Sequence, residues 1–101
     1  MGVVRYAPLA EEDLYEISLF TIKQWSVQQA DIYLAELEEF CELISNFPGI
    51  GRECDVIFSG LRRMEHKSHV VFFVPVADGI TISRILHKSR DISDEEFEEF
   101  S

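Results

Sequence analysis

The sequence predicts a small α+β domain in which an N-terminal antiparallel helical hairpin packs on a small, mainly antiparallel β-sheet. Three observations support this fold class. The first half of the chain carries two apolar stripes with helical spacing. The second half carries strand-like runs separated by turn residues. The chain of 101 residues has the length of one domain.

The first half of the chain is predicted to form one short strand and two helices. Val3–Tyr6 is β-branched and aromatic, as strands are. A helix over Pro8–Gln24 begins with a proline suited to its first turn. Ser26, with Gln29 three places later, has the form of a capping box and begins a second helix that ends near Ser45. The short link between the two helices predicts an antiparallel hairpin.

The second half is predicted to supply the rest of the sheet. Asp55–Phe58 reads as a short extended piece, and Leu61–Glu65 as a strand. Ser68–Val76 is a stronger strand with apolar residues on both faces, and an Asp-Gly turn joins it to the return strand Ile80–His87. Because Pro75 cannot donate a ladder hydrogen bond, we expect its end of the strand at a sheet edge or a bulge.

Charge is distributed unevenly along the chain, whose formal net charge is −10. Residues 1–50 carry two basic and nine acidic side chains, and residues 91–101 carry six acidic and no basic ones. Residues 51–90 carry seven basic and four acidic side chains. A chain this acidic is not attracted to the phosphates of nucleic acid. We therefore expect no sequence-specific nucleic-acid binding by this chain alone. The local basic stretch suits a specific acidic partner.

Several classes of protein are excluded at this level. The longest apolar run is strand-sized, and the N-terminus lacks the apolar core of a signal peptide, so we expect a cytoplasmic protein with no membrane partner. The two cysteines, Cys41 and Cys54, fit a reducing compartment, and Cys41 falls on a helical apolar stripe that predicts burial. The sequence shows no phosphate-binding loop, no HExxH and no zinc-ligand spacing. We therefore predict no catalytic residue, no metal ligand and no cofactor.

A basic and histidine-bearing set occupies the predicted hairpin and its neighbours: Arg62, Arg63, His66, Lys67, His69, Arg84, His87, Lys88 and Arg90. Strand alternation places Arg84 on the face of Ile80 and Ile82, and His87 on the opposite face. Arg84 has two open interpretations, a structural ion pair with a helix carboxylate or a contact to a partner or phosphate. His87 is equally open to a structural or a functional role.

Several segments in order resemble the ParE branch of the RelE/ParE toxin superfamily. They are Ala10-Glu11-Glu12-Asp13-Leu14, Trp25-Ser26-Val27-Gln28-Gln29-Ala30, Tyr33-Leu34, Asn46-Phe47-Pro48-Gly49-Ile50-Gly51, Gly60-Leu61-Arg62, Ser68-His69-Val70-Val71-Phe72-Phe73, and Ile85-Leu86-His87-Lys88 with Asp91. The resemblance implies one toxin domain over residues 1–91 and an acidic tail over residues 92–101. Two positions depart from the family pattern: Lys67 stands where a small residue is usual, and Phe73 where tyrosine is usual.

The resemblance implies the toxin of a type II toxin–antitoxin system that forms a hetero-oligomer with a ParD-like antitoxin. The expected target is DNA gyrase or a related type II topoisomerase, which the toxin would inhibit without being an enzyme itself. Two alternatives stay open. One is a ribosome-dependent mRNA endoribonuclease of the RelE branch, with Arg62, Arg84 and His87 as phosphate clamp and general acid–base. The other is a decayed toxin that only binds its antitoxin.

Two groups of residues are the candidates for these contacts. The candidates for target binding are the basic residues Arg62, Arg84, His87, Lys88 and Arg90. The candidates for antitoxin binding are the apolar residues of the strongest strand, Val70, Phe72, Phe73 and Val74, against which an antitoxin could lay a strand or an amphipathic helix.

Overall fold

The computed structural model describes residues 2–90 and residue 97. These residues form two helices packed on a five-stranded sheet of strand order β1-β5-β4-β3-β2. The elements are β1 (Val3–Tyr6), α1 (Pro8–Gln24), α2 (Val27–Asn46), β2 (Arg52–Glu53), β3 (Arg62–His66), β4 (His69–Val76) and β5 (Gly79–His87). β1 pairs with β5 in parallel, and the other pairs are antiparallel. The predicted fold class is confirmed, whereas the acidic tail, apart from residue 97, lies outside the described residues.

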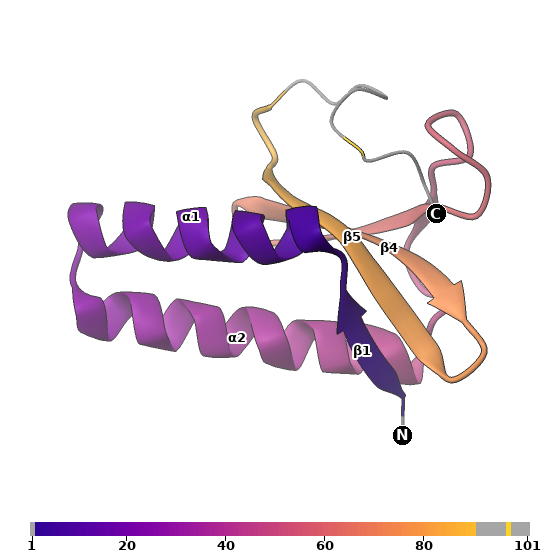
Figure 1. The fold of residues 1–101 in the computed structure, drawn as a ribbon, viewed down its shortest axis with the longest axis horizontal. Helices are drawn as coiled ribbons and strands as arrows, with labels where there is room; N and C mark the ends of the chain where they lie inside the picture. Colours follow the sequence, from indigo (N-terminus) through magenta and orange to yellow (C-terminus); the bar gives the residue numbers. More distant parts are fainter. Residues whose placement is uncertain (1, 91–96, 98–101) are drawn as a thin grey trace.

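The two helices form the predicted hairpin. α1 has the predicted bounds, and α2 runs one residue beyond the predicted end. The Ser26 hydroxyl accepts a hydrogen bond of 3.0 Å from the backbone N–H of Gln29, so the predicted cap forms. Figure 1 shows the helices side by side, with the hairpin end that joins them extending beyond the sheet. Because of this overhang, the sheet does not cover part of the helical surface.

The connection between β2 and β3 differs from the prediction. The residues expected as an extended piece, 55–58, form turns, and the extended residues lie earlier, in β2. The Asp55 carboxylate accepts a hydrogen bond of 2.9 Å from the Gly60 N–H, and the Cys54 carbonyl accepts one of 2.9 Å from the Ile57 N–H. An aspartate that bonds backbone nearby favours turns over strands, which explains the difference.

A β-bulge in β5 overturns the predicted alternation of that strand. Phe73 of β4 pairs with Ile82, whereas the preceding residue, Phe72, pairs with Arg84. β5 therefore holds one extra residue between Ile82 and Arg84. An extra residue reverses which side chains face which side of a sheet. Ile82 and Ile85 therefore both lie in the core under the helices.

The sheet is covered on both faces. The core between helices and sheet contains Ala10, Ile17, Leu37, Cys41, Ile44, Val71, Phe73, Ile80, Ile82 and Ile85. The face away from the helices, here called the outer face, carries a second cluster of Cys54, Leu61, Val70, Phe72, Leu86 and Phe97. The burial predicted for Cys41 is confirmed.

The strand proposed for antitoxin binding is consequently not an open surface. Phe73 is buried under the helices, whereas Val70 and Phe72 are buried in the outer cluster and Val74 packs partly buried against it. These four side chains are therefore covered by other parts of the described chain. The reason is that the segment between β2 and β3, together with Phe97, supplies a second layer that the sequence pattern did not reveal.

Two local predictions about β4 can be checked in the backbone. β3 pairs with β4 only as far as Phe73, so Pro75, which pairs with Ile80 of β5, lies at a local sheet edge as predicted. Lys67, in the turn between β3 and β4, has a φ of 54°. Glycine adopts this left-handed conformation at least cost, so Lys67 stands at a position whose backbone favours glycine.

One buried ion pair ties α1 to the sheet. The Arg84 guanidinium donates to both carboxylate oxygens of Asp13, from Nε at 2.8 Å and from Nη2 at 2.7 Å. The Ile85 backbone N–H, next to the bulge, donates to the same carboxylate at 2.9 Å. Both side chains are buried. The interpretation of Arg84 as a structural partner of a helix carboxylate is confirmed.

We predict that Asp13→Asn destabilises the fold by about 3–5 kcal/mol, because it removes the negative charge that the buried guanidinium contacts through two hydrogen bonds. Glu12→Gln, at the exposed neighbouring position, is the matched control and should cost less than about 0.5 kcal/mol. Urea unfolding followed by circular dichroism measures both. Equal midpoints for the two variants would show that the pair does not stabilise the fold.

Candidate functional site

Two adjoining hollows lie where the hairpin end meets the sheet. The first has a volume of about 270 Å³ and is lined by Phe20, Thr21, Trp25, Gln29, Ile32, Tyr33, Glu36, Lys67, Ser68 and His69. The second, of about 160 Å³, is lined by Asp13, Glu16, Ile17, Phe20, His69, Ile85, Leu86, His87 and Arg90. Phe20 and His69 line both hollows, so the two form one continuous surface, here called the hairpin-end surface.

The helical side of this surface is apolar and open. Phe20 is 61% exposed, Trp25 74% and Ile32 49%. Trp25 follows Ile17 and Thr21 at helical spacing, yet it is exposed because that end of the helix projects past the sheet (Figure 1). Large apolar side chains gathered around a hollow are typical of a surface that a partner covers.

His69 forms the floor between the two hollows. Its Nδ1 lies 2.6 Å from the Tyr33 hydroxyl of α2, and its ring meets that of His87 edge-on at 5.6 Å. Burial, and then the nearby His87, lower the pKa of His69 to about 4. Burial also raises the pKa of Tyr33, so its hydroxyl keeps the proton that it can donate to a neutral imidazole. The pair thus joins α2 to β4 through an uncharged hydrogen bond.

His87 stands at the exposed end of β5. Its Nδ1 accepts a hydrogen bond of 3.2 Å from the Ser89 backbone N–H and lies 2.7 Å from the Ser89 hydroxyl. These contacts orient the ring so that it lines the second hollow beside His69 and Arg90. The bulge explains this placement, because alternation without it would turn His87 to the outer face.

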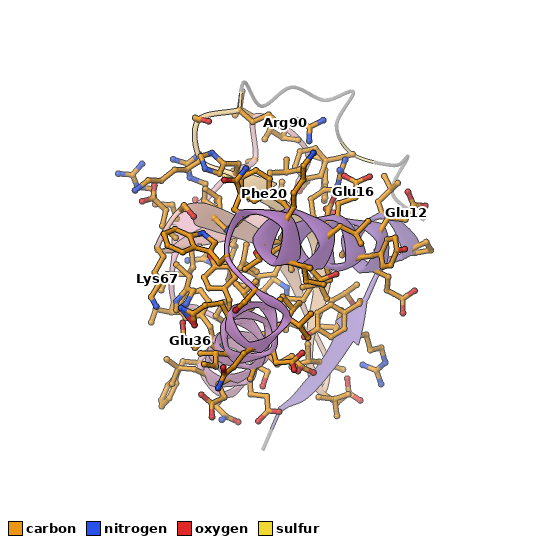
Figure 2. All side chains as sticks on the ribbon, turned by 90° about the vertical axis from the view of Figure 1, so that its left-hand side faces the viewer. Glu12, Glu16, Phe20, Glu36, Lys67 and Arg90 are labelled. Atoms are coloured by element: carbon orange, nitrogen blue, oxygen red, sulfur yellow. The ribbon has the colours of Figure 1, made fainter. Side chains whose placement is uncertain are left out.

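An ion pair forms the rim of the first hollow. The Lys67 ammonium lies 2.7 Å from the Glu36 carboxylate, and His66 Nε2 lies 3.8 Å from the same carboxylate. The hydrogen bond between Lys67 and Glu36 raises the pKa of Lys67 and lowers that of Glu36. Figure 2 looks onto this end of the molecule and shows Lys67 beside Glu36, with Arg90 beyond Phe20 on the other side. The rim is therefore charged on both sides of an apolar centre.

The five predicted target-binding residues separate into two groups. Arg62 donates to the carbonyls of Gly49 at 2.7 Å and Gly51 at 2.9 Å, so it fixes the loop before β2. Arg84 is held by its carboxylate partner on α1. Only the remaining three, His87, Lys88 and Arg90, are exposed. His87 and Arg90 meet in the second hollow, and Lys88 follows directly after β5.

Sequence reasoning missed the apolar half of the site. Phe20 and Ile32 were not singled out, although both are large apolar residues that stand beside the helical stripes. A surplus of such residues was the available signal. What periodicity could not supply was the position at which the sheet stops covering the helices.

Two further observations bound the chemistry of the site. Within residues 2–90 and 97, no group of three or more His, Cys, Asp or Glu side chains is arranged to hold a metal ion. Neither of the described helices is long and apolar enough to cross a membrane.

Comparison with solved structures defines the class of fold. A chain from the chromosomal ParDE TA system of P. aeruginosa matches with a TM-score of 0.71 and 20% sequence identity, covering 86% of this chain and 96% of that one. The present fold is therefore that of a protein from a toxin–antitoxin system.

Comparison of sequences then gives the family. The family model described as the ParE toxin of the type II toxin–antitoxin system parDE matches residues 4–92. Toxin ParE1 of Mycobacterium tuberculosis is 37% identical over 87 residues, which are 85% of this chain and 89% of the relative. Toxin ParE1 of Caulobacter vibrioides is 36% identical over 89 residues, 88% and 92% of the two chains. This chain belongs to the ParE toxin family.

The neutral His69 makes stability depend on pH. In the unfolded chain the imidazole binds a proton near pH 6.5, but in the folded chain only near pH 4. Between these values the unfolded state binds more protons, so stability falls as the pH falls, by about 2 kcal/mol after allowing for solvent screening at a partly buried site. His69→Gln, which can still accept from Tyr33, should flatten this part of the profile. Urea unfolding at several pH values measures it, and parallel profiles for the two proteins would contradict the assignment.

Proposed function

We propose that this ParE toxin acts in the cytoplasm by binding a type II topoisomerase such as DNA gyrase, and that a ParD-like antitoxin neutralises it in a hetero-oligomer. The observation that supports a binding role is that the two arginines of the predicted phosphate clamp contact other parts of the same chain. Arg62 and Arg84 make internal contacts, which removes two of the three groups that RNA cleavage would need. The exposed basic side chains after β5, Lys88 and Arg90, suit contacts to a protein surface.

The endoribonuclease alternative is less well supported. His69 and His87 lie close together, as a general acid and base would. However, the Glu16 carboxylate lines the same hollow, and the whole chain is strongly acidic. Both features repel the phosphates of RNA.

We further propose that the antitoxin covers the hairpin-end surface, in place of the buried β4 residues. An amphipathic helix places apolar anchors at intervals of three and four residues, which suits the line of Phe20, Trp25 and Ile32 around the first hollow. The charged rim of Lys67 and Glu36 would then meet the polar edges of that helix.

The topoisomerase assignment predicts that the purified toxin traps gyrase on cleaved DNA and blocks supercoiling. The double variant His87→Ala/Arg90→Ala should lower this potency at least about tenfold, the loss expected on removing about 1.4 kcal/mol of contact energy. Lys23→Ala, another exposed cation, is the control and should act like the wild type.

Three other outcomes separate the alternatives. Unchanged supercoiling with no trapped complex contradicts the gyrase proposal. Messenger RNA cleavage in a translation extract, lost in His87→Ala, would favour the endoribonuclease. Normal growth of bacteria that demonstrably express the toxin without antitoxin would indicate a decayed toxin.

The docking proposal predicts that Phe20→Ser/Trp25→Ser weakens antitoxin binding at least about 100-fold, since buried aromatic anchors dominate such interfaces. The matched control is Val56→Ser, because Val56 is apolar and 92% exposed but lies between β2 and β3. Calorimetric titration with the ParD-like antitoxin of the same system measures both. Equal affinities for the two variants would show that the antitoxin binds a different surface.

A further inference from the structure

Two arginines lie directly opposite each other on the outer face of the sheet. Arg52 of β2 is the register partner of Arg63 of β3, and Arg63 is in turn the partner of Phe72. Register partners in antiparallel strands point to the same side of a sheet, so both arginines lie on the side of Phe72, which is the outer face. Burial raises the pKa of the Cys54 thiol in the outer cluster, and Arg63 and Arg52 oppose this rise, which places both charges near that cluster. Like charges in register destabilise a strand pair, so an anion that contacts both would stabilise it.

The positive charge of this arginine pair is not neutralised within the described part of the chain. No described carboxylate lies at ion-pair distance from Arg52 or Arg63. Glu53, the neighbour of Arg52 in the chain, instead lies 3.7 Å from Arg62. Glu65 lines the same hollow of about 230 Å³ as the two arginines, but it does not pair with either of them. Both guanidiniums are therefore able to bind a carboxylate from outside this part of the chain.

The backbone around Arg52 is held firmly against β3. Gly51 has a φ of 92°, and a Cβ atom at its position would clash with the carbonyl group of Arg63. Arg62 holds the same loop through its hydrogen bonds to the carbonyls of Gly49 and Gly51. Arg52 is exposed and Arg63 is half-buried. Because the backbone positions of both arginines are set before a partner arrives, binding costs little conformational entropy of the main chain.

Two exposed apolar side chains precede the arginine pair in the chain. Phe47, directly after α2, is 60% exposed, and Ile50, shortly before β2, is 40% exposed. The Ile50 backbone N–H donates to the Phe47 carbonyl at 2.9 Å, so both residues belong to one turn. Figure 1 shows the C-terminal end of α2 at the end of the molecule away from the link between the helices. Phe47, Ile50, Arg52 and Arg63, here called the β2 patch, are therefore separate from the hairpin-end surface.

We propose that the β2 patch binds an acidic segment of a partner protein, whose carboxylates contact Arg52 and Arg63 while an adjacent apolar side chain covers Phe47 and Ile50. Guanidiniums bind carboxylates through paired hydrogen bonds, and two of them in register offer more donors than a lone surface cation. A nucleic-acid phosphate suits the patch less well, because the chain as a whole is strongly acidic. Since the patch is separate from the hairpin-end surface, this second contact does not depend on the topoisomerase and antitoxin assignments.

The first test is an NMR titration of the full chain with a blocked peptide, acetyl-Glu-Leu-Glu-Glu-Phe-Glu-amide, and with the same peptide carrying glutamine in place of each glutamate. The acidic peptide should shift the amide signals of residues 50–53 and 62–64 and bind at least about tenfold more tightly than its neutral counterpart. Equal binding of the two peptides, or shifts confined to the hairpin-end surface, would overturn the proposal. Tighter binding of a single-stranded DNA hexamer than of the acidic peptide would also overturn it, because the patch would then prefer phosphates.

The second test removes the two arginines. Arg52→Gln/Arg63→Gln should lower the affinity for the acidic peptide at least about tenfold. Its melting temperature should stay unchanged or rise, because two opposed like charges are lost. The control Arg5→Gln/Lys23→Gln removes the same charge from other exposed positions and should bind the peptide within about twofold of the wild type at physiological salt. A clear fall in the melting temperature of the first variant would show that the arginines are structural, and equal peptide affinities for the two variants would show general charge attraction. Either result contradicts the proposed site.

A third comparison tests the apolar part of the patch. Phe47→Ser should lower the affinity for the acidic peptide about fivefold, the effect of partly burying an aromatic ring. Val27→Ser is the matched control, because Val27 is 61% exposed but lies at the opposite end of α2, and it should bind the peptide like the wild type. Equal affinities for these two variants would contradict a contact between the peptide and Phe47.

Discussion

The contact between Asp13 and Arg84 determines how the rest of the molecule is arranged. A single carboxylate on α1 accepts two hydrogen bonds from the guanidinium and a third from the Ile85 backbone. The third bond lies directly after the bulge in β5, so the ion pair holds the strand in its shifted register. That register turns His87 toward the helices, where it meets His69. The hollow between α1 and the end of β5 therefore depends on a carboxylate that is itself held by Arg84.

The value of this pair lies in selecting one register more than in adding stability. Bringing two charges out of water costs about as much as their attraction returns, so a buried ion pair contributes little net free energy. The Asp13 carboxylate also accepts a hydrogen bond from the Ile85 N–H directly after the bulge, so the ion pair is tied to the shifted register. This contact favours the bulged pairing of β4 and β5 over a regular one, in which every side chain after Ile82 would face the other way.

Much of the fold could be predicted because its signals are local. The cap at Ser26, the proline at the start of α1 and the Asp-Gly turn each fix a boundary through contacts within a few residues. The bulge could not be predicted, because it depends on a carboxylate 71 residues away from Arg84. For the same reason the site was predicted only in part: the exposed cations after β5 were found, whereas the exposure of Trp25 depends on where the sheet ends.

The overhang of the hairpin also limits what can cover it. A small domain gains little from leaving Phe20 and Trp25 in water, since each buried aromatic contributes about 2–3 kcal/mol. The helices around these side chains are acidic, and Figure 2 shows Glu12 and Glu16 on the same helix as Phe20. A partner that buries the aromatics must therefore bring its polar edges against negative charge, at the cost of repulsion unless those edges are basic. An apolar stripe flanked by Lys or Arg is the composition that meets both requirements.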